Sequence, residues 1–268
     1  MFKSDMNKNT IIINERKWFY PAVYLLFLIL SFLPLYTERP YSYEHTQEVI
    51  ISLLSISIVP FNRFGIIFHI STLVLVLLMI FIPKEFDCLF PFYVGLNYLV
   101  IAFTQSIGRT ERYGLVVHTG NLAISAVLGV IWLGTSIRGN PRIHLEKIRW
   151  HHIVLFPLAL LAFWSPYQIK EGMVFPDFNP LFLLTSPDYG FTLCFTTPVF
   201  LYLLMIFYRE INRFAIRATA FCGLLFALYN LTHWFQPESR WMGVLHLPLL
   251  VISVFTFFWA KTTEKKFQ

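Results

Sequence analysis

Long apolar segments alternate with short polar segments along almost the whole chain. The apolar runs lie at residues 18–36, 64–83, 88–105, 114–133, 152–165, 190–208, 213–232 and 241–260. Because a helix needs about 20 apolar residues to cross a bilayer, this pattern predicts an all-α, polytopic membrane helix bundle of about eight transmembrane helices. Residues 49–60 are apolar but too short to cross alone, and we expect them to be re-entrant or interfacial. We expect one membrane domain covering residues 1–268, because no soluble domain fits beside these helices.

The overall composition agrees with lipid as the surrounding solvent. Hydrophobic residues make up 56% of the chain and charged residues 13%, whereas about a quarter of a soluble domain is charged. The net charge of +6 comes mostly from short loops between apolar runs, so membrane topology explains it better than nucleic-acid binding. The three cysteines, Cys88, Cys194 and Cys222, form no CxxC pair and give no disulfide framework.

The distribution of lysine and arginine predicts the orientation of the helices. With the N-terminus inside, all but six of the 21 positive residues fall on inner segments, as the positive-inside rule requires. The six outer residues are Arg39, Arg63, Arg109, Arg112, Lys170 and Arg240. An even number of helices preserves this bias, so we expect both termini in the cytoplasm. The polar start of the chain lacks a signal-peptide cleavage site, and these features together suit a multi-pass protein of a bacterial inner membrane.

The outer loops carry an unusual kind of charge. Five of their six positive residues are arginines, whose planar guanidinium groups hold carboxylates and phosphates through paired hydrogen bonds. The same loops hold eight carboxylates: Glu38, Glu44, Glu48, Glu111, Glu171, Asp177, Asp188 and Glu238. Two interpretations stay open at this point. Either the arginines pair with these carboxylates, or some of them bind an anionic ligand.

Three of the outer arginines begin a repeated element. An arginine is followed by an aromatic residue, a glycine and, six positions on, a histidine in Arg63–His69, Arg112–His118 and Arg240–His246. A degenerate copy, Asp188–Cys194, has Asp in place of Arg and Cys in place of His. At 1.5 Å per residue, each histidine lies about 9 Å along its helix from the arginine. We therefore expect four quasi-repeated helix pairs that bring the three histidines and Cys194 to one depth near the outer face.

The first functional hypothesis is a metal or b-type haem site for redox chemistry in the outer leaflet. Imidazole and thiolate groups suit zinc, copper and iron. The candidate ligands are His69, His118, Cys194 and His246, and the anion-binding candidates above a haem are Arg63, Arg112 and Arg240. This layout is similar to that of the eight-helix haem A synthases, although their motifs are absent and Cys194 stands where they have His. The structural alternative is that each histidine hydrogen-bonds a neighbouring helix.

The second hypothesis is an enzyme that acts at the outer face on an amphipathic anionic substrate, such as a lipid-linked phosphate or carboxylate. The same three arginines would hold the anion. A histidine would act as general acid or base and a carboxylate would orient it. The candidates are His118, His233, His246, Glu111 and Glu238. The alternative for the polar and aromatic residues 230–240 is an ordinary interfacial belt.

A third hypothesis is a transport or accessory subunit without catalytic activity. Repeated helix pairs are typical of transporters, whose binding sites lie near the middle of the membrane. Polar residues expected at that depth are few, with Asn97 and Asn121 as the main candidates. We expect no carboxylate there, which disfavours an ion-coupled pump. Under all three hypotheses the lipid bilayer is the expected partner of the chain.

Overall fold

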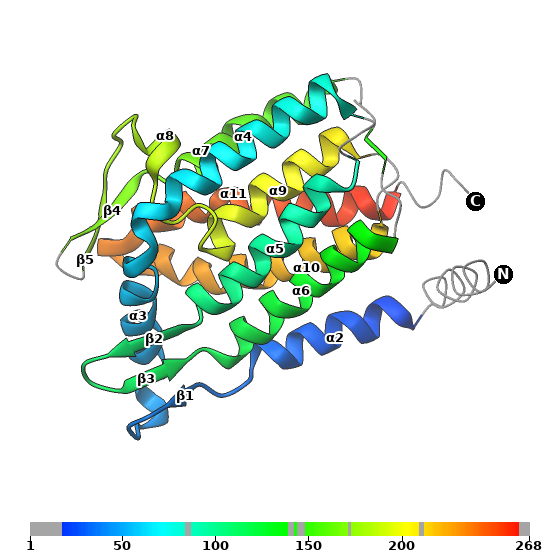
Figure 1. The fold of residues 1–268 in the computed structure, drawn as a ribbon. Helices are drawn as coiled ribbons and strands as arrows, with labels where there is room; N and C mark the ends of the chain where they lie inside the picture. The colour runs from blue at the N-terminus through cyan, green and yellow to red at the C-terminus, as the bar shows by residue number, and fades with distance from the viewer. Residues whose placement is uncertain are drawn as a thin grey trace.

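Long helices of alternating direction form the body of the protein (Figure 1). The computed structural model describes residues 18–83, 87–138, 142–143, 148–170, 173–208 and 212–262. Within these residues the apolar runs form α2 (Phe19–Ser31), α4 (Gly65–Phe81), α5 (Leu89–Thr104), α6 (Thr119–Arg138), α7 (Trp150–Trp164), α9 (Leu193–Phe207), α10 (Arg213–Asn230) and α11 (Arg240–Thr262). The described chain is therefore mostly helical, as predicted.

The lengths of these helices divide them into two groups. Four helical segments are long and apolar enough to cross a membrane: Tyr43–Phe81, Thr119–Arg138, Arg213–Phe235 and Pro237–Ala260. The shorter helices α2, α5, α7 and α9 are also apolar and contain 13 to 16 residues. Length and composition thus support a helical membrane protein, and the count of eight crossings stays a prediction.

The described chain begins and ends at the same end of the bundle. The start of α2 and the end of α11 lie at the right of Figure 1, and the strands of the described residues lie at the left. We call the end of the bundle at the right the terminal end and the end at the left the strand end. An even number of long antiparallel helices produces this arrangement.

The stretch expected to be re-entrant or interfacial forms a separate helix. α3 (Thr46–Ser57) follows a short turn, η1 (Tyr43–His45), and leads through η2 (Val59–Phe64) into α4. Figure 1 shows that α3 lies across the strand end of the bundle. Val49 and Leu53 on α3 are fully buried against a small sheet. This helix covers the strand end, which is a position that suits an interfacial helix.

At the strand end the chain also forms two small antiparallel sheets, which the sequence pattern did not predict. One has the strand order β1 (Tyr36–Thr37), β3 (Gly114–Val117), β2 (Ile107–Thr110). The other is the hairpin of β4 (Tyr167–Lys170) and β5 (Met173–Pro176). The strands lie in segments between helices, which the sequence pattern predicted to be separate loops.

β3 occupies the first part of the run at 114–133, which was predicted to be helical throughout. Gly114 closes the turn before it with a positive φ of 67°, a backbone conformation that favours glycine. Val116 and Val117 then pair with β1 on one side and β2 on the other. β-branched residues suit such a strand. Apolarity alone could not separate this strand from the helix that begins at Thr119, because both are apolar.

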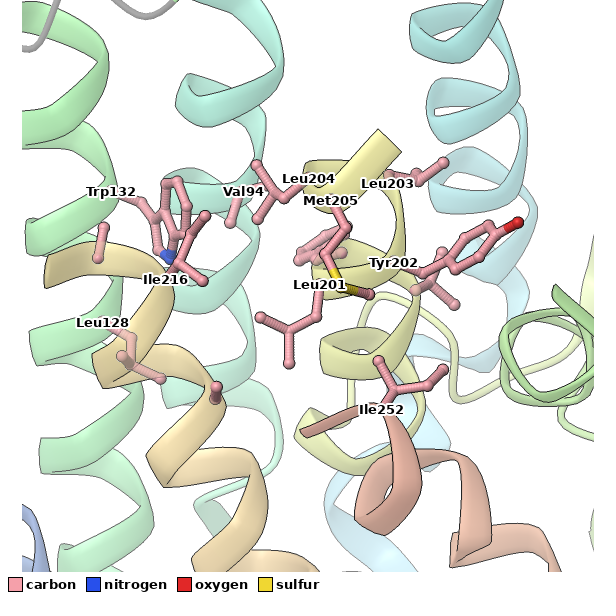
Figure 2. Close-up of a cluster of buried hydrophobic side chains, with 14 of the residues drawn as sticks. Val94, Leu128, Trp132, Leu201, Tyr202, Leu203, Leu204, Met205, Ile216 and Ile252 are labelled. Carbon is pink, nitrogen blue, oxygen red and sulfur yellow. The ribbon is translucent and has the colours of Figure 1, made fainter. Parts of the chain in front are cut away.

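The core is continuous through the bundle. Figure 2 shows Trp132 of α6 and Leu201 of α9 among the buried side chains that fill it. The Trp132 indole donates a hydrogen bond of 2.8 Å to the Thr219 hydroxyl and so ties α6 to α10. α5 and α6 approach closely, because a Cβ on Gly95 would lie only 3.0 Å from the carbonyl oxygen of Gly129.

Residues 186–192, which connect α8 (Phe182–Thr185) to α9, form a buried loop inside the bundle. Its peptide groups leave helical geometry, so neighbouring side chains must satisfy them. Asn97 donates to the carbonyl of Gly190 at 3.0 Å, and the N–H of Gly190 donates to the Thr196 hydroxyl at 2.9 Å. Gln105 accepts from the N–H of Leu193 at 2.9 Å. Side chains of α5 and α9 and of the segment after α5 therefore hold the loop from several sides.

Two glycines let α4 approach the buried loop. A Cβ on Gly65 would collide with the carbonyl oxygen of Ser186, and one on Gly190 would collide with the Phe68 ring. Gly190 also has a positive φ of 88°, which side-chain-bearing residues rarely adopt. The loop and α4 are consequently in contact at the level of the backbone.

We expect Gly190→Ala to lower the free energy of unfolding by about 1–3 kcal/mol, because it adds both backbone strain and a collision with Phe68. Gly134→Ala in α6 is the matched control. A Cβ there meets nothing within 4 Å, and alanine favours a helix over glycine by up to about 1 kcal/mol. Thermal unfolding in detergent micelles measures both variants. Equal stability of the two would contradict the account of the buried loop.

Candidate functional site

His69, a predicted metal ligand, lies against the buried loop. Its Nε2 atom is hydrogen-bonded to the Ser186 hydroxyl at 2.9 Å. The ring is fully buried and lies 4.5 Å from the centroid of Phe163 and 4.8 Å from that of Tyr189. These contacts match the structural alternative, in which a histidine joins its helix to a neighbouring segment.

His118 lies outside the helix on which the repeated element placed it. The segment from Arg112 to His118 runs through the turn and strand of the β2–β3 hairpin, so the expected 9 Å helical spacing is wrong for this copy. His118 precedes α6, and its Nδ1 accepts a hydrogen bond of 3.3 Å from the N–H of Asn121. Burial lowers the pKa of His118, which favours the neutral ring that this acceptor role requires.

The three arginines proposed to hold an anion stand on different elements. Arg112 forms an ion pair with Glu48 of α3, and the guanidinium of Arg63 lies 4.8 Å from the centre of the Phe64 ring. Arg240 is exposed at the first residue of α11. For Arg112 the structure therefore favours carboxylate pairing.

Other outer charges follow the same pattern. Arg109 pairs with Glu38 at 3.4 Å, and Arg39 donates to the backbone carbonyl of Glu111 at 2.8 Å. The N–H of Leu115 and the Arg109 charge lower the pKa of Glu38. Glu111 and Glu238 are both exposed at the strand end. The Arg109–Glu38 and Arg39–Glu111 contacts join the segment after β1 to the β2–β3 hairpin.

The structure brings two of the predicted catalytic histidines together. The rings of His233 and His246 stack with centroids 5.6 Å apart. His233 lies on η4 (Leu231–Phe235), the turn that continues α10, and His246 lies in the second turn of α11. His246 Nδ1 donates to the Met242 carbonyl at 2.8 Å. When the ring is neutral, Nε2 is therefore its hydrogen-bond acceptor.

The His246 crevice, as we call it, is a narrow seam where α10 and η4 meet α11, and in this structure it is too tight to admit a water molecule. Four residues from each side line it: Ala227, Asn230, Leu231 and Trp234, and Gly243, His246, Leu247 and Leu250. Both sets follow the i, i+3, i+4, i+7 spacing that marks one helix face. The absence of a side chain at Gly243 makes room for the Trp234 indole, since a Cβ would lie 2.8 Å from its Nε1. The lining is polar toward the strand end and apolar toward the middle of the bundle.

A buried carboxyl lies behind this crevice. Asp188, in the buried loop, is fully buried, and the Tyr167 side chain is a hydrogen-bonding neighbour of its carboxyl group. Burial raises the pKa of Asp188 to about 7, and the nearby Tyr167 hydroxyl acts in the opposite direction. Cys194 lies close enough to Asp188 for the two side chains to interact electrostatically. Its sulfur accepts from the Asn230 amide at 3.4 Å, so these residues adjoin the crevice lining.

Asp188 is the residue whose placement sequence reasoning missed. The charge pattern placed it in an outer loop with the other carboxylates, and the repeat treated it as a substitute for arginine. One signal could have found it. No other charged residue lies between Asp177 and Asp188 or between Asp188 and Arg209, so it is an isolated charge beside the start of a long apolar run.

The predicted metal ligands do not form a recognisable metal centre. In the part of the chain that the structure describes, no group of three or more His, Cys, Asp or Glu side chains is arranged to hold a metal ion. Comparisons with models of protein families, with curated proteins and with solved structures find no match. The metal and haem hypothesis stays a prediction without geometric support, and the histidine pair with its crevice is the candidate site.

The pKa of Asp188 makes stability depend on pH with a defined sign. Between the ordinary value of 3.8 and about 7 the folded protein keeps a proton that the unfolded chain has lost. The free energy of unfolding therefore falls as the pH rises through this window, by up to about 1.4 kcal/mol per pH unit. Asp188→Asn should remove this fall.

Thermal unfolding at several pH values measures the difference between wild type and Asp188→Asn, so that effects of other titrating groups cancel. Glu44→Gln, at an exposed carboxyl, is the control and should follow the wild type. A wild type and an Asp188→Asn variant with parallel pH profiles would rule out a protonated, buried Asp188.

Proposed function

We propose that all eight apolar helices cross a bacterial inner membrane and that the terminal end faces the cytoplasm. Two observations support this topology. Fifteen of the 21 lysines and arginines lie in segments assigned to that side, because only six fall on the outer loops. The first and last of these helices also meet the same end of the bundle (Figure 1). The short helices would need local thinning of the bilayer, which costs little per ångström.

Labelling of single cysteines tests this topology. In a chain whose three native cysteines are replaced, Glu44→Cys at the strand end should react with a membrane-impermeant maleimide in intact cells. Arg142→Cys, in the segment between α6 and α7, should react only after the membrane is permeabilised. Reaction of both from the same side would overturn the proposed orientation.

We propose further that the protein is an enzyme acting on an amphipathic substrate with an anionic, phosphate or carboxylate head group. The observation that carries this proposal is the gradient along the His246 crevice. Asn230, His246 and Trp234 lie toward the strand end, and Ala227 and Leu250 lie deeper. A lipid has the same order of polarity when its head is at the interface, so the head group would meet His246.

The residues suggest separate roles at the head group. His246 Nε2 would act as general acid or base, with its ring orientation fixed by the hydrogen bond to Met242. The stacked His233 would hold the imidazole plane and disfavour a positive charge on both rings at once. Arg240, one residue from the indole of Trp241 and six before His246, stands where a helix N-terminus also attracts anions. Of the three arginine candidates, Arg112 is already paired and Arg63 lies on η2, whereas Arg240 begins the helix that carries His246.

The test is phosphate release from a lipid phosphate. Vesicles of phosphatidylcholine containing phosphatidic acid or a polyprenyl phosphate supply the substrate, and the phosphate is transferred to water. We expect His246→Gln to reduce the rate about 100-fold or more, the usual contribution of a general acid or base. His45→Gln is the control, at a histidine paired with Glu48 on the far side of the strand end, and should keep the wild-type rate. No release from either lipid, or an unchanged rate in His246→Gln, would contradict the proposal.

A further inference from the structure

The connection between β5 and the buried loop exposes large apolar side chains at even spacing. Four of them follow one another at intervals of three residues, and each is at least 42% exposed: Phe175, Phe178, Leu181 and Leu184. No charged residue lies between Asp177 and Asp188. We call residues 175–185 the apolar loop. An exposed apolar surface of this kind marks a place where a protein partner or a membrane covers the molecule.

The backbone of the apolar loop makes its own hydrogen bonds. The N–H groups of residues 182–185 all donate to carbonyl oxygens three or four positions earlier. The N–H of Leu181 donates to the Asn179 side chain at 3.0 Å, and the N–H of Asn179 donates to the Asp177 side chain at 3.0 Å. The two prolines of the loop have no N–H to satisfy. A loop in water does not need internal partners for its donors, whereas a segment in lipid does.

The apolar loop is held against helices that also expose apolar side chains. α8 packs against α4 and α7 at the strand end (Figure 1). The indole of Trp164, the last residue of α7, donates to the carbonyl of Asn179 at 3.0 Å. Leu73 on α4 and Ile153 on α7 are among the exposed apolar residues of these helices. The loop therefore continues the apolar surface of α4, which belongs to a segment long and apolar enough to cross a membrane.

The length of α7 leaves a place for such a loop. Its 15 residues span about 22 Å, whereas the hydrocarbon core of a bilayer is about 30 Å thick. Arg149, exposed immediately before α7, limits the apolar length at the terminal end, so the shortfall lies at the strand end. α9 has the same length, but almost all of its side chains are buried, so it faces protein. The shortfall next to lipid is thus at α7, where the apolar loop lies.

We propose that the apolar loop inserts into the bilayer beside the strand end of α7, with Phe178 and Leu181 in contact with lipid chains. The partner is lipid rather than a second protein chain, because the loop continues the surface of α4 and satisfies its backbone donors internally. On the proposed orientation this is the outer leaflet. The inference rests on the proposed crossing of α4 and α7 and is independent of the proposed enzyme activity.

Spin labels on single cysteines test the insertion. The full-length chain, with its three native cysteines replaced, is labelled at Leu181→Cys and reconstituted in phosphatidylcholine vesicles. Power saturation compares collisions with oxygen, which concentrates in lipid, and with a water-soluble nickel chelate. We expect oxygen to relax the Leu181 label more than nickel does, as at Leu73→Cys on α4. Glu44→Cys, exposed at the strand end, is the aqueous control and should show the opposite order.

The same measurement separates the other outcomes. A Leu181 label relaxed mainly by nickel, with the Leu73 label in lipid, would place the loop in water and overturn its insertion alone. Protection of the Leu181 label from both reagents would show that protein covers the loop, and would also overturn the insertion. A Leu73 label relaxed mainly by nickel would instead contradict the proposed crossing of α4. Labels at Phe178→Cys and Leu184→Cys should agree with Leu181→Cys, so that no single variant decides the result.

Discussion

The peptide groups of the buried loop impose the physical constraint on which the rest of the bundle depends. Peptide groups that leave a helix in apolar surroundings still require hydrogen bonds, and each one left unpaired costs several kcal/mol. Asn97, Gln105 and Thr196 meet that requirement here. Of the two polar residues predicted near the middle of the membrane, Asn97 is thereby explained without an ion pathway, because it binds the backbone of a segment distant from α5 in the sequence. The Asn121 amide donates instead to the Ser106 hydroxyl at 2.8 Å.

The loop also sets the geometry of the candidate site. It fixes the first turn of α9, where Cys194 receives a hydrogen bond from Asn230, a residue of the crevice lining. The next residue, Phe195, packs 5.4 Å from the His246 ring. On the opposite side, the loop contacts α4 through Gly65. The buried loop thus connects α4, which has many exposed side chains, with the helices that form the crevice.

The sequence predicts this fold well where one physical signal is sufficient. Apolar runs of helical length identify the eight apolar helices, since lipid requires apolar side chains and internal backbone hydrogen bonds. β3 escaped prediction because Gly114–Val117 is apolar in either conformation and its partners, β1 and β2, come from other segments. The sequence named both His233 and His246 as catalytic candidates but did not predict that their rings lie together. Their contact and the burial of Asp188 depend on packing, which spacing along one chain does not encode.

The pairing of β1 with β3 has a consequence for how the protein is made. α2 is the first of the described helices to be synthesised. β3, which pairs with the strand that follows α2, comes much later in the chain. So do α6 and α10, the helices on which α2 packs. At about 5–20 residues per second, ribosomes need several seconds to reach them. On the proposed topology, α2, with only 13 residues, would have to stay in the bilayer without its neighbours during that interval. The helix that is made first would therefore have to wait for its partners.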